Sequence, residues 1–196
     1  MQVRHHLPIA FIVVALASPA MAQTDSAARQ KVERYARDLG ATFTSDPALR
    51  DAIRVSTRQH RKFGYPETLA EDARWRNEMA ADRKGPRPLV DSVFNNPVSA
   101  KLKDIVSSAP GGAVVDIQVT DGYGWNVAQT APTSDFYQGD ERAWQSVISA
   151  EPDKIVLSAP ETGDGRILIQ AALPVVDGES VIGAIAIVVD AERVPQ

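Results

Sequence analysis

The chain has 196 residues, a formal net charge of −4 at pH 7 and no cysteine. The acidic balance argues against nucleic acid as a partner, because phosphate contacts need clustered positive charge. The lack of cysteine excludes disulfide bonds and thiolate zinc sites. A chain of this length suits one domain.

The N-terminal residues have the pattern of a secretory signal peptide. Arg4 gives a basic start, an apolar run covers residues 7–17, and the sequence AMA at residues 20–22 is a small-x-small cleavage site. The apolar run is shorter than the roughly 20 residues of a membrane-spanning helix. We therefore predict a signal peptide over residues 1–22 and a periplasmic or secreted protein with no membrane span after cleavage. An uncleaved membrane anchor is the alternative.

Residues 23–97 are predicted to form a helical N-terminal region. Apolar residues recur every three or four positions over residues 25–43, as they do along one side of a helix. Asp46 followed by Pro47 is a helix-start signal, and the second helix is expected to end near His60. With glycine and proline as breaks, further helices are expected over residues 67–82, 89–95 and 98–108.

The second predicted helix carries a stripe of basic side chains, which are Arg50, Arg54, Arg58, Arg61 and Lys62. The N-terminal helices could dock on an envelope receptor through this stripe or pair two copies of the chain. We favour the simpler interpretation, a solvent-exposed face balanced by nearby acids. His60 lies in the same stretch and is expected to be exposed. A hydrolase triad is not predicted, because no candidate serine has a G-x-S-x-G setting.

Residues 98–196 are predicted to form the sheet region. Alternating apolar residues and turn signals indicate five strands, over residues 115–120, 125–129, 154–158, 166–176 and 181–189. Hairpin connections make the sheet antiparallel. Pro174 marks an edge or a bulge, and the apolar run at residues 184–189 indicates a covered central strand. The expected fold class is α+β, with helices before the sheet and across it.

The segment between the second and third predicted strands is rich in aromatic and acidic residues. Asp135 and Gln138 have the spacing of a capping box, which predicts a helix start. Trp144 and Val147 then have the spacing of a buried helix side. Such a mixture of aromatic and acidic residues beside a sheet is typical of a small-molecule pocket.

Three segments carry a resemblance to a known family. They are the sequence DGxGxNVA from Asp121, the sequence TSDFYQGDE over residues 133–141 with Trp144 beyond it, and the final hairpin over residues 173–190. These segments resemble the extracytoplasmic PAS-like sensor domains called PDC or Cache domains. The resemblance implies a PAS-like five-stranded antiparallel sheet that binds a small ligand between the sheet and the segment after strand two. In membrane receptors, such domains pass the signal through the membrane.

Seven residues are predicted to line the ligand site, and they are Trp125, Thr133, Ser134, Asp135, Tyr137, Trp144 and Gln170. Trp125 and Tyr137 would form walls. Asp135 would hold a ligand cation, Thr133 and Ser134 would donate hydrogen bonds, and Gln170 would reach in from a strand. The structural alternatives are a helix cap for Asp135 and a core position for Trp144. No metal ion and no cofactor are predicted.

The function expected from these features is that of an exported, non-enzymatic, sensor-like domain that recognises a small polar molecule. Two alternatives stay open. One is a periplasmic adaptor or scaffold that binds an envelope protein without a ligand, and it requires the pocket to be filled by the protein's own aromatic side chains. The other is a hydrolase that pairs Asp135 with Asp140 or Glu141, as glycosidases pair two carboxylates.

Overall fold

The computed structural model describes residues 19–80, 84–163 and 165–195. The predicted signal peptide lies mostly outside the described residues, and its last four positions form the start of the first helix. Among the helices within those ranges, none combines the length and the apolar character needed to cross a membrane.

The N-terminal half is helical, as predicted, with α1 (Pro19–Thr44), α2 (Pro47–His60), α3 (Tyr65–Met79), α4 (Pro88–Phe94) and α5 (Pro97–Ser108), followed by the single turn η1 (Pro110–Gly112). The starts of α2 and α5 follow the same rule. Asp46 Oδ1 accepts a hydrogen bond from Ala48 N at 2.8 Å, and Asn96 Oδ1 accepts one from Ser99 N at 2.8 Å. Proline occupies the first helical position in both. A polar cap followed by proline therefore fixes these boundaries.

The C-terminal half forms an antiparallel sheet, which confirms the α+β prediction. Its strands are β1 (Val114–Asp121), β2 (Asn126–Gln129), β3 (Val156–Leu157), β4 (Glu161–Gly163), β5 (Arg166–Asp177) and β6 (Ser180–Asp190). The strand order is β2-β1-β6-β5-β3, and β4 also pairs with β5. The apolar strand β6 is central, as predicted, because it lies between β1 and β5.

The sheet has one strand more than the five predicted. Both β3 and β4 pair with β5, at Ala171–Ala172 and at Arg166–Leu168 respectively. Pro160 lies between β3 and β4 and has no backbone N–H to donate to the ladder, so the pairing is interrupted there. The sixth strand is therefore the continuation of a broken edge strand.

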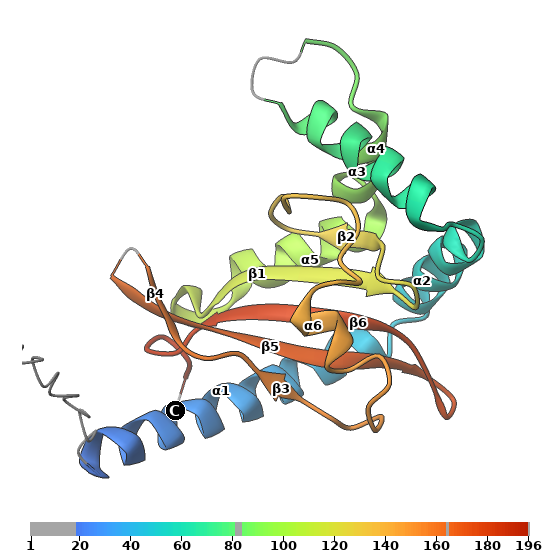
Figure 1. Ribbon diagram of the computed structural model, residues 1–196. Coiled ribbons are helices and arrows are strands. Elements are labelled where there is room, and N and C mark those ends of the chain that lie inside the picture. The colour runs from blue at the N-terminus through green and yellow to red at the C-terminus, as the bar shows by residue number, and fades with distance from the viewer. Residues whose placement is uncertain (1–18, 81–83, 164, 196) are drawn as a thin grey trace, which may run out of the picture.

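Two layers of unequal size cover the sheet (Figure 1). On one face, α1, α2 and α5 bury the main core, in which Val32, Ile53 and Leu102 from the helices meet Ile117 and Ile185 from the strands. On the other face, the short helix α6 (Arg142–Gln145) lies over β5 and β6. The cluster beneath it is small and centres on Val147, Ala172 and Ala184.

Helices α3 and α4 lie beyond the β2 edge of the sheet (Figure 1). Trp75 of α3 is fully buried against Phe136, in the loop that follows β2. Glu78 of α3 is also buried, and its Oε2 accepts hydrogen bonds from Leu89 N at 2.8 Å and Val90 N at 3.0 Å. A carboxylate of one helix therefore caps the first turn of the next, and this holds α3 and α4 together.

The basic stripe on α2 is partly neutralised by acids. Arg54 forms ion pairs with Asp51 and with Asp177 in the β5–β6 hairpin. Arg50 donates a hydrogen bond to the carbonyl oxygen of Ser45 at 2.8 Å. Both contacts agree with a solvated face balanced by nearby groups. Docking of this stripe on an envelope receptor or on a second copy stays a prediction.

Candidate ligand-binding site

Asp121, at the end of β1, organises the turn into β2. Its side chain is fully buried, and Oδ1 accepts hydrogen bonds from Tyr123 N at 2.9 Å and Trp125 N at 3.0 Å. Asp121 therefore holds the turn through its own side chain. Oδ2 accepts a hydrogen bond from Ser56 Oγ at 2.7 Å and lies 3.3 Å from His60 Nδ1. The carboxylate thus joins the β1–β2 turn to the last turns of α2.

The prediction that His60 is exposed is wrong. Its side chain is 11% exposed, and its ring stacks on Trp125 with the centroids 4.8 Å apart. The reason is that α2 ends against the β1–β2 turn, so its last residue faces inward. Ser56, His60 and Asp121 do not form a catalytic triad, because both partners contact the same ring nitrogen and Ser56 donates its hydrogen to Asp121.

The loop after β2 is held by α3. Asp72 Oδ1 accepts hydrogen bonds from Phe136 N at 2.9 Å and Tyr137 N at 2.8 Å. Trp75 Nε1 donates a hydrogen bond to the carbonyl oxygen of Thr133 at 3.0 Å. These bonds hold the loop against α3, and Tyr137 forms an isolated β-bridge with Trp125. The sequence did not indicate this clamp, because α3 is distant along the chain.

The predicted helix start at Asp135 is wrong. Asp135 lies in a bend of this loop, where its Oδ1 accepts a hydrogen bond from Gln138 Nε2 at 2.6 Å. Helix α6 begins later, at Arg142, and its N-cap residue Glu141 makes no side-chain capping bond. The backbone bonds to Asp72 and the bridge at Tyr137 outweigh the local capping pattern.

Four of the seven predicted site residues lie together at the β2 edge. Trp125 is buried and packs edge-on against Tyr137, with the ring centroids 5.2 Å apart. Asn126 Nδ2 donates hydrogen bonds to Thr133 Oγ1 and to the carbonyl oxygen of Asp135. These side chains are therefore engaged with one another and with α3. Their contact with a ligand stays a prediction.

Of the other three predicted residues, Ser134 lies on the exposed rim of that cluster, and Trp144 and Gln170 lie apart from it. Ser134 is exposed, and its Oγ donates a hydrogen bond to Asp135 Oδ1 at 3.2 Å. Trp144 packs on the cluster beneath α6 and donates a hydrogen bond from Nε1 to the carbonyl oxygen of Asp121 at 2.9 Å. Gln170 lies in the middle of β5.

Asp135 is an acid whose ionisation the fold opposes. Partial burial raises its pKa above the ordinary value, and the negative charges of Asp72 and Asp140 also raise it. Hydrogen bonds from Ser134 and Gln138 act in the opposite direction. Because the folded pKa exceeds the unfolded one, the stability from this group is complete at low pH and is lost as the pH rises through the folded pKa.

Replacing Asp135 by asparagine removes this ionisation and keeps an oxygen for Gln138. We expect Asp135→Asn to raise the free energy of unfolding at pH 7 by roughly 0.5 kcal/mol or less, because solvent screens a partly exposed site. Well below the unfolded-state pKa of about 3.9, where the carboxyl is protonated in both states, the two proteins should be equally stable. Urea unfolding across the acid range measures the difference, and a difference independent of pH would contradict this explanation.

Two cavities of very different size lie between α6 and the sheet. Under Trp144, beside Gln118 and Thr120, only about 20 Å³ is open, enough for one water-sized group. Next to it, a groove of about 610 Å³ runs between α6 and the edge formed by β3, β4 and β5. We call this the α6 groove. It lies where the resemblance places the ligand, between the sheet and the segment after strand two.

The α6 groove combines an apolar floor with three unengaged polar side chains. Val156, Leu157 and Ala172 supply the floor. Arg142 lines the groove from α6, Glu161 from β4 and Gln170 from β5. The guanidinium, the carboxylate and the amide have no hydrogen-bond or ion-pair partner among the described residues. Of the three, only Gln170 was predicted.

Arg142 and Glu161 were missed because no local pattern singles them out. Arg142 follows the acidic TSDFYQGDE segment, and Glu161 lies in a strand of three residues outside the five predicted strands. The fold brings them together because β4 folds back on β5 beside α6.

Comparisons with known proteins find sensor domains among the solved structures. No family model matches the sequence, and no curated protein matches it. The extracellular domain described as that of a histidine kinase, vpHK1S-Z8, is 12% identical with a TM-score of 0.46, over 91% of this chain and 61% of that one. The V. cholerae histidine kinase DctB sensor domain is 13% identical with a TM-score of 0.36, over 89% and 59%.

A chemoreceptor domain gives a similar result. The ligand-binding domain of the Pseudomonas fluorescens chemoreceptor CtaA in complex with L-serine is 13% identical with a TM-score of 0.36, over 83% of this chain and 60% of that one. The chain therefore spans less than two thirds of the length of each of these three sensor domains.

Proposed function

We propose that the chain is an exported, non-enzymatic, sensor-like domain that binds a small zwitterionic molecule, such as an amino acid, in the α6 groove. One observation carries the proposal. A cationic side chain, Arg142, and an anionic one, Glu161, line the same groove, and neither forms an ion pair within the described residues. The predicted signal peptide supports export to the periplasm or the medium.

The chemistry of the groove matches a zwitterion group by group. A guanidinium offers two parallel N–H donors to a carboxylate, so Arg142 would take the ligand carboxylate. Glu161 would take the ligand ammonium group. Gln170 has both a donor and an acceptor on its amide and would bond either polar group. The apolar floor of Val156 and Leu157 would receive the ligand side chain.

The polar residues of the groove suit binding better than catalysis. Of its two serines, Ser158 donates its hydroxyl hydrogen to the carbonyl oxygen of Ala159, and Ser146 donates to that of Ala143. Among the residues that line the groove, Glu161 is the single carboxylate, so no acid pair is available there for hydrolysis. Asp135 lies outside the groove and is bonded to Gln138.

A thermal-shift screen followed by calorimetry tests the proposal. The screen compares amino acids with simple amines and simple carboxylates. At a hundredfold excess over its dissociation constant, a ligand that binds only the folded state adds about 2.7 kcal/mol of stability. We expect amino acids to raise the melting temperature. Simple amines and simple carboxylates should have little effect, because an amine leaves Arg142 without a partner and a carboxylate leaves Glu161 without one.

Arg142→Ala is expected to weaken binding of an amino-acid hit by about 10- to 100-fold, the usual loss for one hydrogen bond between charged groups. Arg58→Ala removes an exposed arginine from α2, outside the groove, and serves as the matched control. A hit whose affinity is the same in wild type, Arg142→Ala and Glu161→Gln would refute the assignment of the groove. No hit among the amino acids would refute the proposed ligand class.

A further inference from the structure

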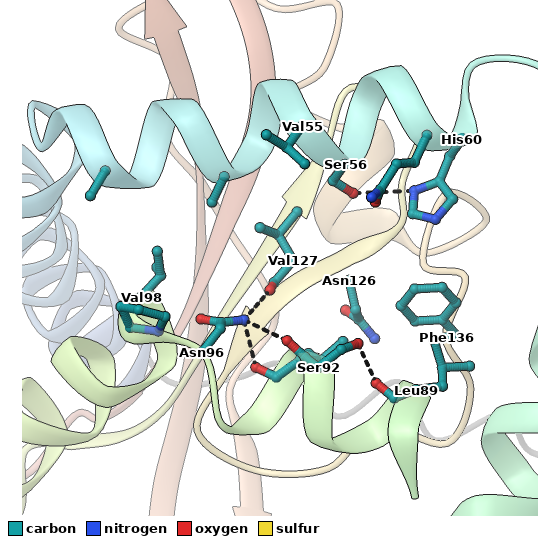
Figure 2. A pocket seen from close by; sticks show the side chains of 15 residues that line it. Val55, Ser56, His60, Leu89, Ser92, Asn96, Val98, Asn126, Val127 and Phe136 are labelled. Carbon is teal, nitrogen blue, oxygen red and sulfur yellow. Dashed lines mark hydrogen bonds between the residues drawn. The ribbon is translucent and has the colours of Figure 1, made fainter.

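A second cavity lies on the helix-covered side of the sheet. It has a volume of about 450 Å³ and opens between α2 on one side and α4 and α5 on the other, with β2 between them (Figure 2). None of its lining residues lines the α6 groove. We call it the α2–α4 cavity. It is independent of the function proposed above.

The walls of this cavity are mainly apolar. The apolar lining residues come from α2, α4, the start of α5, β2 and the following loop, and they are Ala48, Ala52, Val55, Leu89, Val93, Pro97, Val98, Val127 and Phe136. Apart from His60, no lining residue is ionisable. Burying an isolated charge against such walls is costly, so the lining favours an uncharged occupant.

Most polar side chains of the lining are already satisfied by the protein. Asn96 Nδ2 donates to the carbonyl oxygens of Ser92, Val93 and Val127 (Figure 2). The amide of Asn126 is bonded to the loop after β2 and to Gln118. Ser92 Oγ donates to the carbonyl oxygen of Leu89 at 2.6 Å. These groups therefore have little capacity left for a ligand.

Two side chains are exceptions. Gln59, at an exposed position, has no hydrogen-bond partner for its amide among the described residues, and His60 has only one of its ring nitrogens engaged. Nδ1 lies 3.1 Å from Ser56 Oγ and 3.3 Å from Asp121 Oδ2. The single hydroxyl hydrogen of Ser56 is directed at Asp121, so both neighbours of Nδ1 are acceptors. Nδ1 must therefore carry a hydrogen, which makes Nε2 of the neutral ring an acceptor.

The free nitrogen of His60 is turned towards another residue that lines the cavity. Figure 2 shows the ring at one end of the cavity, with Nδ1 turned to Ser56 and Nε2 turned away from it towards Phe136. Nε2 has no hydrogen-bond partner within the part of the chain that the structure describes. The rings of His60 and Phe136 stand edge to face, with centroids 5.7 Å apart, and offer aromatic surfaces at this end.

We propose that the α2–α4 cavity binds a neutral, largely apolar small molecule that bears one hydroxyl or N–H donor, such as a phenol, and that this donor bonds to His60 Nε2. Asp121 and Ser56 act as positioning residues, because they fix the hydrogen on Nδ1 and the plane of the ring. The cavity is within the usual size range of small-molecule sites. The ring of a phenol packs among the valines and against Phe136.

Three matched small molecules, measured by calorimetry on the purified protein, test whether the cavity prefers a neutral ligand with one hydrogen-bond donor. They are p-cresol, 4-methylanisole, which has the same ring without a donor, and p-toluate, which carries a charge. We expect p-cresol to bind at least about tenfold more tightly than 4-methylanisole, the difference made by one hydrogen bond. Binding of p-toluate should be the weakest. Equal affinities for p-cresol and 4-methylanisole, tightest binding by p-toluate, or no binding of p-cresol would each overturn the proposal.

Two substitutions test whether p-cresol binds in the α2–α4 cavity. Val55→Phe fills the mouth of the cavity from an exposed position on α2, and it should abolish p-cresol binding. Leu69→Phe makes a comparable change at an exposed position on α3, outside the lining, and should leave binding unchanged. Unaltered affinity of Val55→Phe would rule out this cavity as the site.

Nitrogen NMR of the unmodified protein tests the role of His60 without a substitution. Addition of p-cresol should shift the Nε2 resonance of the neutral ring, and 4-methylanisole should leave it nearly in place. His60→Asn keeps a side-chain donor towards Asp121 and removes Nε2, so it should bring the affinity for p-cresol down to that for 4-methylanisole. An Nε2 resonance that does not respond to p-cresol would overturn the assigned contact.

Discussion

Asp121→Ala is expected to lower the free energy of unfolding by about 3–5 kcal/mol, because removal of one member of a buried polar network leaves its partners without hydrogen bonds. The carboxylate is fully buried and accepts from Tyr123 N, Trp125 N and Ser56 Oγ, with His60 Nδ1 close to Oδ2. Its loss would release the β1–β2 turn from α2. Urea unfolding monitored by circular dichroism measures the change.

Two variants control for this result. Asp140→Ala removes an exposed aspartate from the loop before α6 and should change the stability by about 0.5 kcal/mol or less. Asp121→Asn keeps an acceptor for the two backbone N–H groups and places an amide donor beside Ser56 and His60, so its loss should be smaller than that of alanine. A loss below about 1 kcal/mol in Asp121→Ala would show that the network contributes less than its burial implies.

Trp75→Ala is expected to cost about 3–5 kcal/mol, the usual range for removing a large buried aromatic side chain. Trp75 is fully buried, stacks on Phe136 with centroids 5.5 Å apart, and stacks on Phe94 at 6.3 Å. Its Nε1 also donates a hydrogen bond to the carbonyl oxygen of Thr133. The residue therefore joins α3 to α4 and to the loop after β2. Urea unfolding again gives the magnitude.

The position of Trp75 also predicts where the structure loosens. Hydrogen exchange in Trp75→Ala should accelerate most in α3 and in residues 130–139. It should accelerate least in β5 and β6, because β1 separates these strands from the β2 edge and they contribute no residue to the Trp75 cluster. Leu69→Ala, at an exposed position of the same helix, is the control and should change stability by about 0.5 kcal/mol or less. Equal acceleration throughout the sheet would contradict the separate role of this cluster.

Local signals in the sequence predicted much of the fold. Asp46 followed by Pro47 places a cap before a proline, and α2 begins there. The apolar run at residues 184–189 identified the central strand. Each of these features depends on neighbours in the chain, so periodicity and capping rules are sufficient to find them.

Contacts between distant segments account for what the sequence did not predict. His60 is largely covered because Asp121 and Trp125, far along the chain, meet the end of α2. The capping pattern at Asp135 is overridden by Asp72 of α3, which binds the backbone of the same loop. In both cases a local pattern favoured one state, and tertiary hydrogen bonds selected another.

The candidate site also combines residues that local sequence signals indicated with residues that only the tertiary fold brings together. Gln170 was predicted because it lies on a strand between apolar neighbours, whereas Arg142 and Glu161 join it only through the pairing of β4 with β5. The predicted aromatic residues gather at the β2 edge, where Trp125 and Tyr137 contact each other and the α3 side of the molecule. A composition rich in aromatic and acidic residues therefore does not distinguish the proposed groove from the aromatic cluster, because both include residues of the segment after β2.

The location of a bound amino acid tests the proposed function most directly. Isotope-labelled protein would be titrated with mixed amino acids, at constant pH and salt, while its backbone amide resonances are followed. The account predicts shifts concentrated at the residues that line the α6 groove, on α6, on β3 and β4, and around Gln170. The absence of shifts, or shifts confined to residues outside the α6 groove, would contradict it.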